Sequence, residues 1–120
     1  MNVLIIAAHG SRKEPSNIEV KKLAERINQK IGDRFDKVIH AFLQIADPLL
    51  ETTISTLVET GARRVVVFPF FTGSGSHILE DIPRLVETAR KNHPGVEFIL
   101  TRHLGRLEAI EQVIIDEVLS

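Results

Sequence analysis

One stretch decides the fold: Phe68-Pro69-Phe70-Phe71-Thr72-Gly73-Ser74-Gly75-Ser76-His77, an apolar run that ends in a glycine-serine loop carrying a histidine. The N-terminal stretch Val3-Leu4-Ile5-Ile6-Ala7-Ala8-His9-Gly10-Ser11 repeats the pattern. A short, continuous apolar run is typical of a strand that is buried on both faces. Both runs therefore predict strands of a covered parallel sheet, each followed by a histidine.

Strand and helix patterns alternate along the whole chain. Apolar and β-branched runs predict strands at 3–8, 37–43, 64–68 and 96–100, and helical spacing predicts helices at 15–31, 47–60, 78–92 and 107–119. We expect Asp47 to cap the second helix, Pro48 to occupy its first position and Gly61 to follow its end. This order predicts an α/β fold, a single-domain, flavodoxin-like four-stranded parallel sheet with helices on both faces and strand order 2-1-3-4.

Composition limits the class of protein. With 120 residues, 43% of them hydrophobic, the chain is long enough for one core and too short for two. A net charge of -1 gives no global field for nucleic acid or anionic membranes, and the absence of cysteine excludes disulfides, thiolate nucleophiles and cysteine-ligated zinc or iron-sulfur sites. The N-terminal apolar run is far shorter than a membrane span, so a cytoplasmic location is expected by default.

Two histidines are candidates for a shared site. His9 and His77 follow the first and third predicted strands, and the carboxyl edge of a parallel sheet is where ligands bind. Imidazole serves both divalent metals and proton transfer, although a lone histidine after a strand more often stabilises its loop. His103, after the fourth strand, is a reserve candidate. His40, inside the second strand, is expected to pack, and His93, at the opposite end of the sheet, to lie on the surface.

The loop Thr72-Gly73-Ser74-Gly75-Ser76 has two interpretations. Its glycines and N–H groups suit a carboxylate or phosphate, or the loop is only a flexible connection. It lacks the Walker lysine and a full G-x-G-x-x-G pattern, so nucleotide binding is weakly supported. Cations near the same edge, which could bind anions or simply be solvated, are Arg12, Lys13, Arg102 and Arg106.

A series of spaced motifs carries a resemblance. They are His9-Gly10-Ser11-Arg12, Ala41-Phe42-Leu43-Gln44-Ile45-Ala46-Asp47-Pro48, Gly61-Ala62-Arg63-Arg64-Val65-Val66-Val67, Pro69-Phe70-Phe71, Gly75-Ser76-His77, Asp81-Ile82-Pro83 and Leu104-Gly105. In this order they resemble the short CbiX type of sirohydrochlorin chelatase over nearly the whole chain. The resemblance implies insertion of cobalt, nickel or ferrous iron into the macrocycle sirohydrochlorin, toward cobalamin, a nickel coenzyme or siroheme. It makes His9 and His77 the catalytic, metal-binding residues and the metal a substrate, with no permanently bound cofactor.

The same resemblance suggests how the macrocycle is held. Its carboxylates and apolar face are expected to meet Ser11, Arg12, Gln44, Phe71, Thr72, Gly73, Ser74, Gly75 and Ser76, with further apolar walls at Phe70, Ile78 and Leu79 unless these pack in the core. Many relatives have an acidic residue at the position of Gln44, which offers only an amide. Either the histidines suffice, or Glu80 or Asp81 supplies the carboxylate.

Larger chelatases of this class hold two similar halves in one chain, whereas this sequence holds one and shows no internal repeat. A homodimer that binds sirohydrochlorin and a divalent metal ion is therefore expected, with no nucleic acid or membrane partner. Two other classes stay open. One is a non-catalytic metal or tetrapyrrole carrier that uses the same histidines, and the other is a phosphate-binding flavodoxin-like module.

Overall fold

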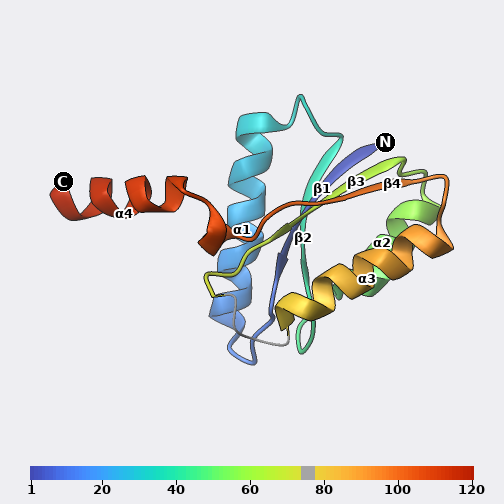
Figure 1. The fold of residues 1–120 in the computed structure, drawn as a ribbon, viewed down its shortest axis with the longest axis horizontal. Coiled ribbons are helices and arrows are strands. Elements are labelled where there is room, and N and C mark those ends of the chain that lie inside the picture. The colour runs from blue at the N-terminus through green and yellow to red at the C-terminus, as the bar shows by residue number, and fades with distance from the viewer. Residues whose placement is uncertain (74–77) are drawn as a thin grey trace.

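The computed structural model describes residues 1–73 and 78–120. In this part of the chain, four parallel strands are arranged in the order β2-β1-β3-β4, as the sequence predicts. The elements follow one another as β1 (Asn2–Ala8), α1 (Glu14–Ile31), β2 (Lys37–Phe42), α2 (Leu50–Glu59), β3 (Arg64–Pro69), α3 (Ile78–Asn92), β4 (Glu97–Leu100), the short 3-10 helix η1 (Leu104–Arg106) and α4 (Ala109–Leu119). Figure 1 shows α1 on one side of the sheet and α2 and α3 on the other.

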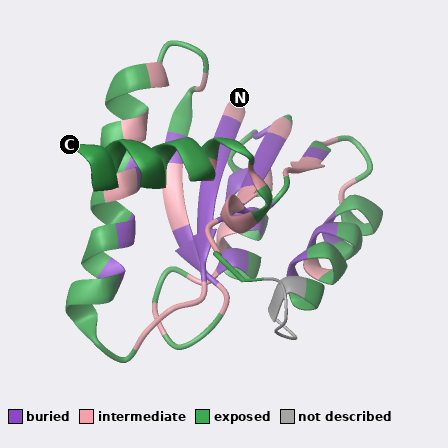
Figure 2. Ribbon diagram, turned by 60° about the vertical axis from the view of Figure 1, so that its left-hand side comes forward, coloured by how far each residue is buried: buried purple, intermediate pink, exposed green. Residues whose placement is uncertain are grey.

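Strand β1 is the centre of the core because both of its faces are covered. Its residues Val3, Ile5 and Ala7 pack with α2 and α3, whereas Leu4 and Ile6 pack with α1. The buried positions gather in the sheet and on the helix sides that face it (Figure 2). Alternate side chains of a strand point to opposite faces, so a strand covered on both sides must be apolar at every position. This explains the uninterrupted run that opens the sequence.

The expected start of α2 is wrong by three residues. The helix begins at Leu50, its N-cap position is Leu49, and Asp47 and Pro48 precede it in a bend. The Phe42 N–H donates to the Pro48 carbonyl at 2.8 Å, and a parallel bridge pairs Phe42 with Leu49. These backbone bonds hold 47–49 against the end of β2, so the segment cannot turn into the helix. The expected end is confirmed, because Gly61 has a φ of 104° directly after the helix.

The last helix departs from the expected arrangement. We expected one helix from 107 to 119, but α4 begins at Ala109 and is preceded by η1. Helix α4 projects from the body of the molecule and covers neither face of the sheet (Figure 1). Pro83 lies inside α3 without ending it. No helix in the described ranges is both long and apolar enough to span a membrane.

His40 lies on β2 at the edge of the sheet. Its ring meets the Phe42 ring edge-on with centroids 5.4 Å apart, which confirms the expectation that it packs. Burial lowers the pKa of His40 below its ordinary value of 6.5, and the nearby charge of Lys21 lowers it further, while Glu25 opposes the shift. The unfolded chain therefore binds this proton more readily than the folded protein does.

We expect the free energy of unfolding to fall as the pH drops below about 6.5, the ordinary histidine value. The contribution of His40 is complete above that pH and is lost as the pH falls through the lower pKa of the folded state. The substitution His40→Gln should flatten this part of the profile, as measured by urea denaturation between about pH 8 and pH 5. The values at the upper pH, where the imidazole is neutral, serve as the control. An unchanged slope in the variant would contradict this assignment.

Candidate metal-binding site at the ends of β1 and β2

His9 follows the last residue of β1, at the carboxyl edge of the sheet, and is half-buried. Its Nδ1 lies 2.8 Å from the Gly10 carbonyl oxygen. A carbonyl can only accept a hydrogen bond, so Nδ1 carries the proton. The Gln44 amide nitrogen donates to the other ring nitrogen, Nε2, at 3.2 Å. These two hydrogen bonds fit the Nδ1–H tautomer, with the Nε2 lone pair turned toward the Gln44 amide, and this tautomer leaves Nε2 as the atom that can bind a metal ion.

Gln44 reaches His9 because the loops after β1 and β2 are joined through their backbones. The Leu43 N–H donates to the Ala8 carbonyl at 2.9 Å, and the Gln44 N–H donates to the His9 carbonyl at 3.2 Å. Gly10 has a φ of 99°, and a Cβ at this position would lie 1.9 Å from the Gln44 carbonyl oxygen. Only glycine permits this approach. Gln44 therefore contacts the His9 ring, and its part in a binding site stays a prediction.

The residue after Gln44 has a strained backbone. Ile45 has a φ of 75°, and the Ala46 N–H donates to the Gln44 carbonyl at 2.8 Å across it. Together they form a γ-turn of the rare, strained kind. A β-branched residue in this region costs on the order of 1–3 kcal/mol, and such outliers concentrate at ligand sites. The side chain of Ile45 is 55% exposed, so burial does not explain its position.

Asn17 holds the loop after His9 and was missed by the sequence analysis. This buried side chain on α1 accepts a hydrogen bond from the Ser11 N–H at 3.0 Å and donates one to the Ser11 carbonyl at 2.8 Å. One amide therefore satisfies both backbone groups of Ser11 and orders the chain that leads away from His9. The available signal was its spacing: Asn17 falls in register with Val20 and Ala24, the buried positions of the helix.

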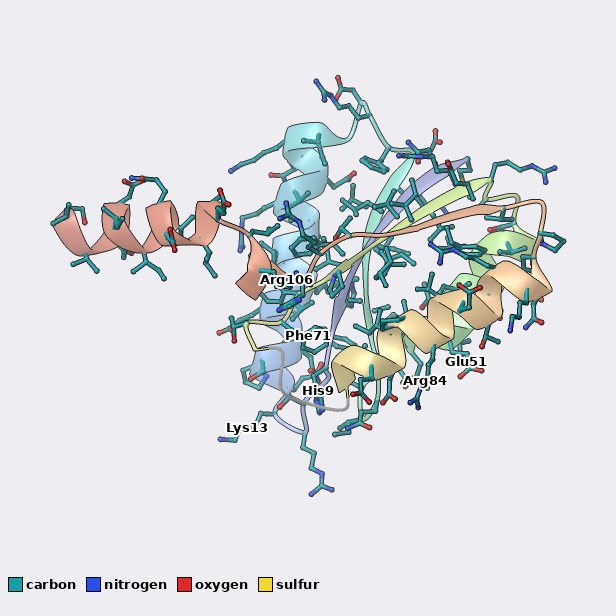
Figure 3. All side chains as sticks on the ribbon, in the orientation of Figure 1. His9, Lys13, Glu51, Phe71, Arg84 and Arg106 are labelled. Carbon is teal, nitrogen blue, oxygen red and sulfur yellow. The ribbon has the colours of Figure 1, made fainter. Side chains whose placement is uncertain are left out.

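A hollow of about 500 Å³ lies beside His9 and is lined by the end of β1 and the loop after it, by α1, and by Phe42 and Phe70. Phe70 lines it together with His9 and Ser11, which places an apolar ring and a polar edge around one space. Phe71 is partly buried against the core on the α2 and α3 side of the sheet, so the rings of Phe70 and Phe71 pack on different faces of the sheet. Figure 3 shows His9 and Lys13 at the end of the molecule where β1 finishes. Arg12, Thr72 and Gly73 are exposed.

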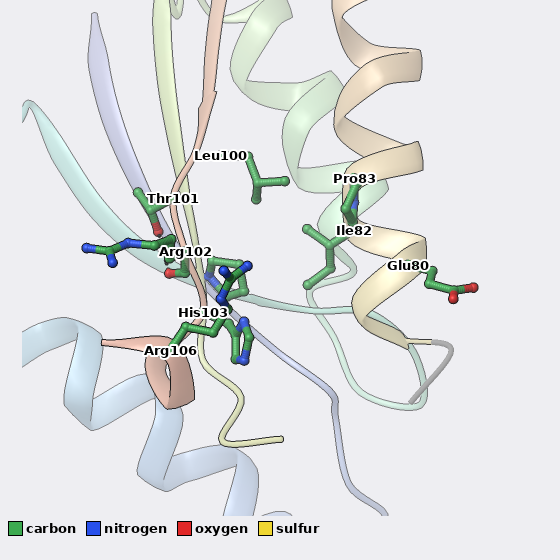
Figure 4. A pocket seen from close by; sticks show the side chains of 9 residues that line it. Glu80, Ile82, Pro83, Leu100, Thr101, Arg102, His103 and Arg106 are labelled. Atoms are coloured by element: carbon green, nitrogen blue, oxygen red, sulfur yellow. Dashed lines mark hydrogen bonds between the residues drawn. The ribbon is translucent and has the colours of Figure 1, made fainter. Parts of the chain in front are cut away.

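A second cleft, of about 590 Å³, opens between the ends of β3 and β4 and the start of α3. Arg102, His103 and Arg106 line it from the β4 side, and Glu80, Ile82 and Pro83 line it from α3. In Figure 4 the side chain of Ile82 points toward the β4 side, whereas that of Glu80 points outward. The imidazole of His103 is buried, with 9% of the residue exposed. Within the described ranges, neither arginine side chain forms a hydrogen bond or an ion pair. The cleft is thus a concave surface with two available guanidinium groups.

Part of the predicted site lies outside the described residues, namely Ser74, Gly75, Ser76 and His77. The pairing of His9 with His77 therefore stays a prediction, as do the contributions of the Ile78 and Leu79 side chains. Among the residues that the structure does describe, no group of three or more histidine, aspartate or glutamate side chains is placed to hold a metal ion. Asp81 is exposed, and Glu80 lines the second cleft.

Comparison with known proteins identifies this arrangement. The family model named CbiX matches residues 3–120, which is nearly the whole chain. The chain belongs to the CbiX family. A solved CbiX protein from Marinobacter aquaeolei VT8 has the same fold, with a TM-score of 0.83 and 26% identity over 99% of this chain and 95% of that one. The resemblance that the motifs indicated is confirmed.

Curated proteins that are similar to this chain in sequence are named as chelatases. The chain is 34% identical over 115 residues to the chloroplastic sirohydrochlorin ferrochelatase of Arabidopsis thaliana, covering 96% of this chain and 50% of that protein. It is 32% identical over 93 residues to the sirohydrochlorin cobaltochelatase of Methanocaldococcus jannaschii, covering 78% of this chain and 64% of the relative. The chain thus spans between half and two thirds of the length of these relatives.

The role of Asn17 is testable by substitution. We expect Asn17→Ala to lower the free energy of unfolding by about 1–3 kcal/mol, because it leaves both backbone groups of Ser11 without their partner. It should also weaken divalent metal binding by several fold, since the loop beyond His9 is no longer held. Urea denaturation and calorimetric titration with Co²⁺ measure the two effects. The control is Gln29→Ala, an exposed position on the same helix, and equal behaviour of the two variants would contradict the role of Asn17.

Proposed function

We propose that this CbiX-family chain inserts a divalent metal ion into sirohydrochlorin. One observation supports this most strongly: His9 is held with Nδ1 bonded to the Gly10 carbonyl, and its Nε2 lies 3.2 Å from the Gln44 amide nitrogen, its hydrogen-bond partner among the described residues. A metal ion can replace that weak donor without deprotonating any group. The named activities of the similar iron and cobalt chelatases support the same reaction. His77 is proposed as the second metal ligand, from its place in the sequence motif.

The reaction exchanges two pyrrole N–H protons of the macrocycle for one divalent cation. His9 suits both halves of it, because imidazole binds first-row metals moderately and accepts protons near neutral pH. The Gln44 amide turns away as the ion arrives at Nε2. Once the ion has moved into the macrocycle, the vacated imidazole can take one of the two released protons, and the other passes to water. The Gly10 carbonyl keeps the ring oriented throughout, since Nδ1 stays bonded to it.

Binding of the macrocycle needs cations for its carboxylates and apolar walls for its face. Arg102 and Arg106 in the second cleft supply guanidinium groups, and Arg12 supplies another beside the loop after β1. Phe70 lines the hollow next to His9, and Leu100 and Ile82 line the cleft. Ser11, Phe71 and the loop from Thr72 to His77 complete the proposed contacts. Gln44 adds no charge, so Glu80 or Asp81 stays a candidate for a supporting carboxylate.

Cobalt is the proposed metal, with nickel or ferrous iron as alternatives. A similar protein named as a cobaltochelatase supports cobalt and one named as a ferrochelatase supports iron, whereas imidazole affinity alone does not select among the three ions. A homodimer and a cytoplasmic location are also proposed. The dimer is supported by the absence of an internal repeat in this sequence and by the prevalence of symmetric dimers among soluble oligomers. A broad macrocycle then lies between two copies rather than on one open surface.

The direct test is incubation of the purified chain with sirohydrochlorin and Co²⁺, Fe²⁺ or Ni²⁺ while the absorption spectrum of the macrocycle is followed. Metal insertion well above the rate without protein supports the proposal. Binding of the macrocycle or the metal without acceleration would instead indicate a carrier. Protection by phosphate compounds, with no dependence on metal, would indicate an anion-binding module.

We predict that His9→Ala and His77→Ala each reduce the insertion rate by at least about 100-fold, the smaller end of the effect of a positioned acid-base group. Loss of the His9 hydrogen bonds should cost only about 1 kcal/mol of stability, so the variant stays folded. The matched control is His93→Ala, because His93 precedes β4 at the opposite edge of the sheet. Wild-type rates in both folded site variants, or a comparable loss in the control, would refute the site.

Gln44→Glu tests whether residue 44 is in reach of the metal. A carboxylate oxygen replaces a group that lies 3.2 Å from His9 Nε2, so Co²⁺ should bind at least several-fold more tightly. Calorimetric titration of both proteins with Co²⁺ measures the difference in affinity. Turnover need not rise, because an ion held more firmly is transferred more slowly. Unchanged Co²⁺ affinity in a folded variant would place residue 44 outside the reach of the ion.

A further inference from the structure

The side chain of Ile45 is exposed although it stands on a strained backbone. Its φ is 75°, a region that β-branched residues rarely adopt, and 55% of the residue is exposed. Ile45 belongs to neither of the two hydrophobic clusters that cover the sheet in the described part of the chain. Glycine would form the same turn without strain. The free protein therefore keeps a side chain here that lowers its stability and is not buried in return.

The strained turn lies next to the atom of His9 that is proposed to bind the metal ion. Ile45 directly follows Gln44, whose amide nitrogen lies 3.2 Å from His9 Nε2. The Gln44 carbonyl accepts the Ala46 N–H at 2.8 Å and also packs against Gly10 in the loop after β1. Figure 1 shows the loops after β1 and β2 at the same end of the sheet. These contacts fix the turn, and with it the Ile45 side chain, at the border of the candidate site.

A hollow of about 450 Å³ lies beside Ile45. Ser11 and Asn17 line both this hollow and the one that opens on His9, so the two hollows adjoin. Ile45 is the one large apolar side chain among the residues that line the hollow, and its charged members are Arg12, Glu14 and Asp47. A ligand that covers Ile45 must therefore combine an apolar face with a polar rim.

The strand order places His9 between two different surfaces. Strand β1 lies between β2 and β3, so the turn after β2 is on one side of His9 and the cleft at the ends of β3 and β4 is on the other. The cleft offers the apolar side chains of Ile82 and Leu100. A macrocycle receives its metal at its centre, so a macrocycle centred over His9 extends toward both surfaces. On the β2 side, Ile45 is the apolar side chain in position to support its face.

We propose that Ile45 binds the macrocycle directly: its side chain packs on the apolar face of sirohydrochlorin, and the carboxylate rim lies over the polar hollow beside Arg12. This inference rests on the proposed function for the identity of the ligand. The turn holds the side chain in place before the macrocycle arrives, so little conformational freedom is lost on binding. A residue that lowers the stability of the free protein in exchange for a ligand contact is a common feature of binding sites.

The first experiment titrates the full chain with metal-free sirohydrochlorin and follows the absorption of the macrocycle. We expect Ile45→Gly to weaken binding about tenfold, the effect of losing one partly buried isoleucine side chain. Ile45→Leu keeps the same number of carbon atoms and should bind within about threefold of the wild type. The matched control is Ile18→Ala, which removes an isoleucine on α1 that is 40% exposed. Unchanged binding by Ile45→Gly, or an equal loss in the control, overturns the proposal.

The second experiment separates a direct contact from an effect on the turn. The midpoint of urea denaturation should rise in Ile45→Gly, because glycine adopts a φ of 75° without strain. Its affinity for Co²⁺, measured by calorimetry without the macrocycle, should equal that of the wild type. A parallel loss of Co²⁺ affinity would show that residue 45 acts through Gln44 and His9, and it overturns the direct contact. A lower midpoint would show that the side chain stabilises the free protein, which also overturns the proposal.

The outcomes for Ile45 and for the proposed activity are distinguishable. A wild-type chain that binds sirohydrochlorin without inserting a metal ion, and loses that binding in Ile45→Gly, contradicts only the activity. Metal insertion by the wild type together with unchanged macrocycle affinity in Ile45→Gly contradicts only the role of Ile45.

Discussion

The candidate site depends on one close backbone contact, the approach of Gly10 to the carbonyl of Gln44. The parallel pairing of β1 with β2 continues past the strand ends through the bonds from Leu43 to Ala8 and from Gln44 to His9. Gly10 allows the two loops to touch, since any side chain there would place a Cβ 1.9 Å from the Gln44 oxygen. Because the backbones are joined, the Gln44 amide falls on the His9 ring. The position and the tautomer of the imidazole then follow from the sheet itself.

The rest of the fold offsets the free-energy cost of the strained backbone next to that contact. The turn at Ile45 stores strain of about 1–3 kcal/mol. Opposing it are the doubly covered strand β1 and the amide of Asn17, which holds the loop after His9 through both backbone groups of Ser11. A loop that is rigid before binding holds the His9 ring in a fixed position for the proposed metal ion. The strained turn and the buried amide are both consistent with a site held in advance of binding.

The sequence predicted the features that local patterns encode. The apolar run of β1, the end of α2 at Gly61 and the position of Gln44 at the strand end were all readable, and the strand order followed from the βα alternation and confirms the flavodoxin-like arrangement. Features set by contacts between distant segments could not be predicted from the sequence. Aspartate often caps helices, but the hydrogen bond from the Phe42 N–H to the Pro48 carbonyl holds Asp47 outside α2. Asn17 looks like any polar residue on a helix until Ser11 is placed against it, and the path of α4 depends on Gly105 meeting Thr72.

The central claim is that His9 presents a neutral Nε2 to the incoming metal ion. The most direct measurement is nitrogen-15 NMR of the imidazole groups of the full chain during titration with Co²⁺. The account predicts that His9 starts as the Nδ1–H tautomer, and that its signals and those of His77 broaden first, while those of His40 and His93 persist. An Nε2–H tautomer at His9, or broadening that begins at His40 or His93, would contradict it.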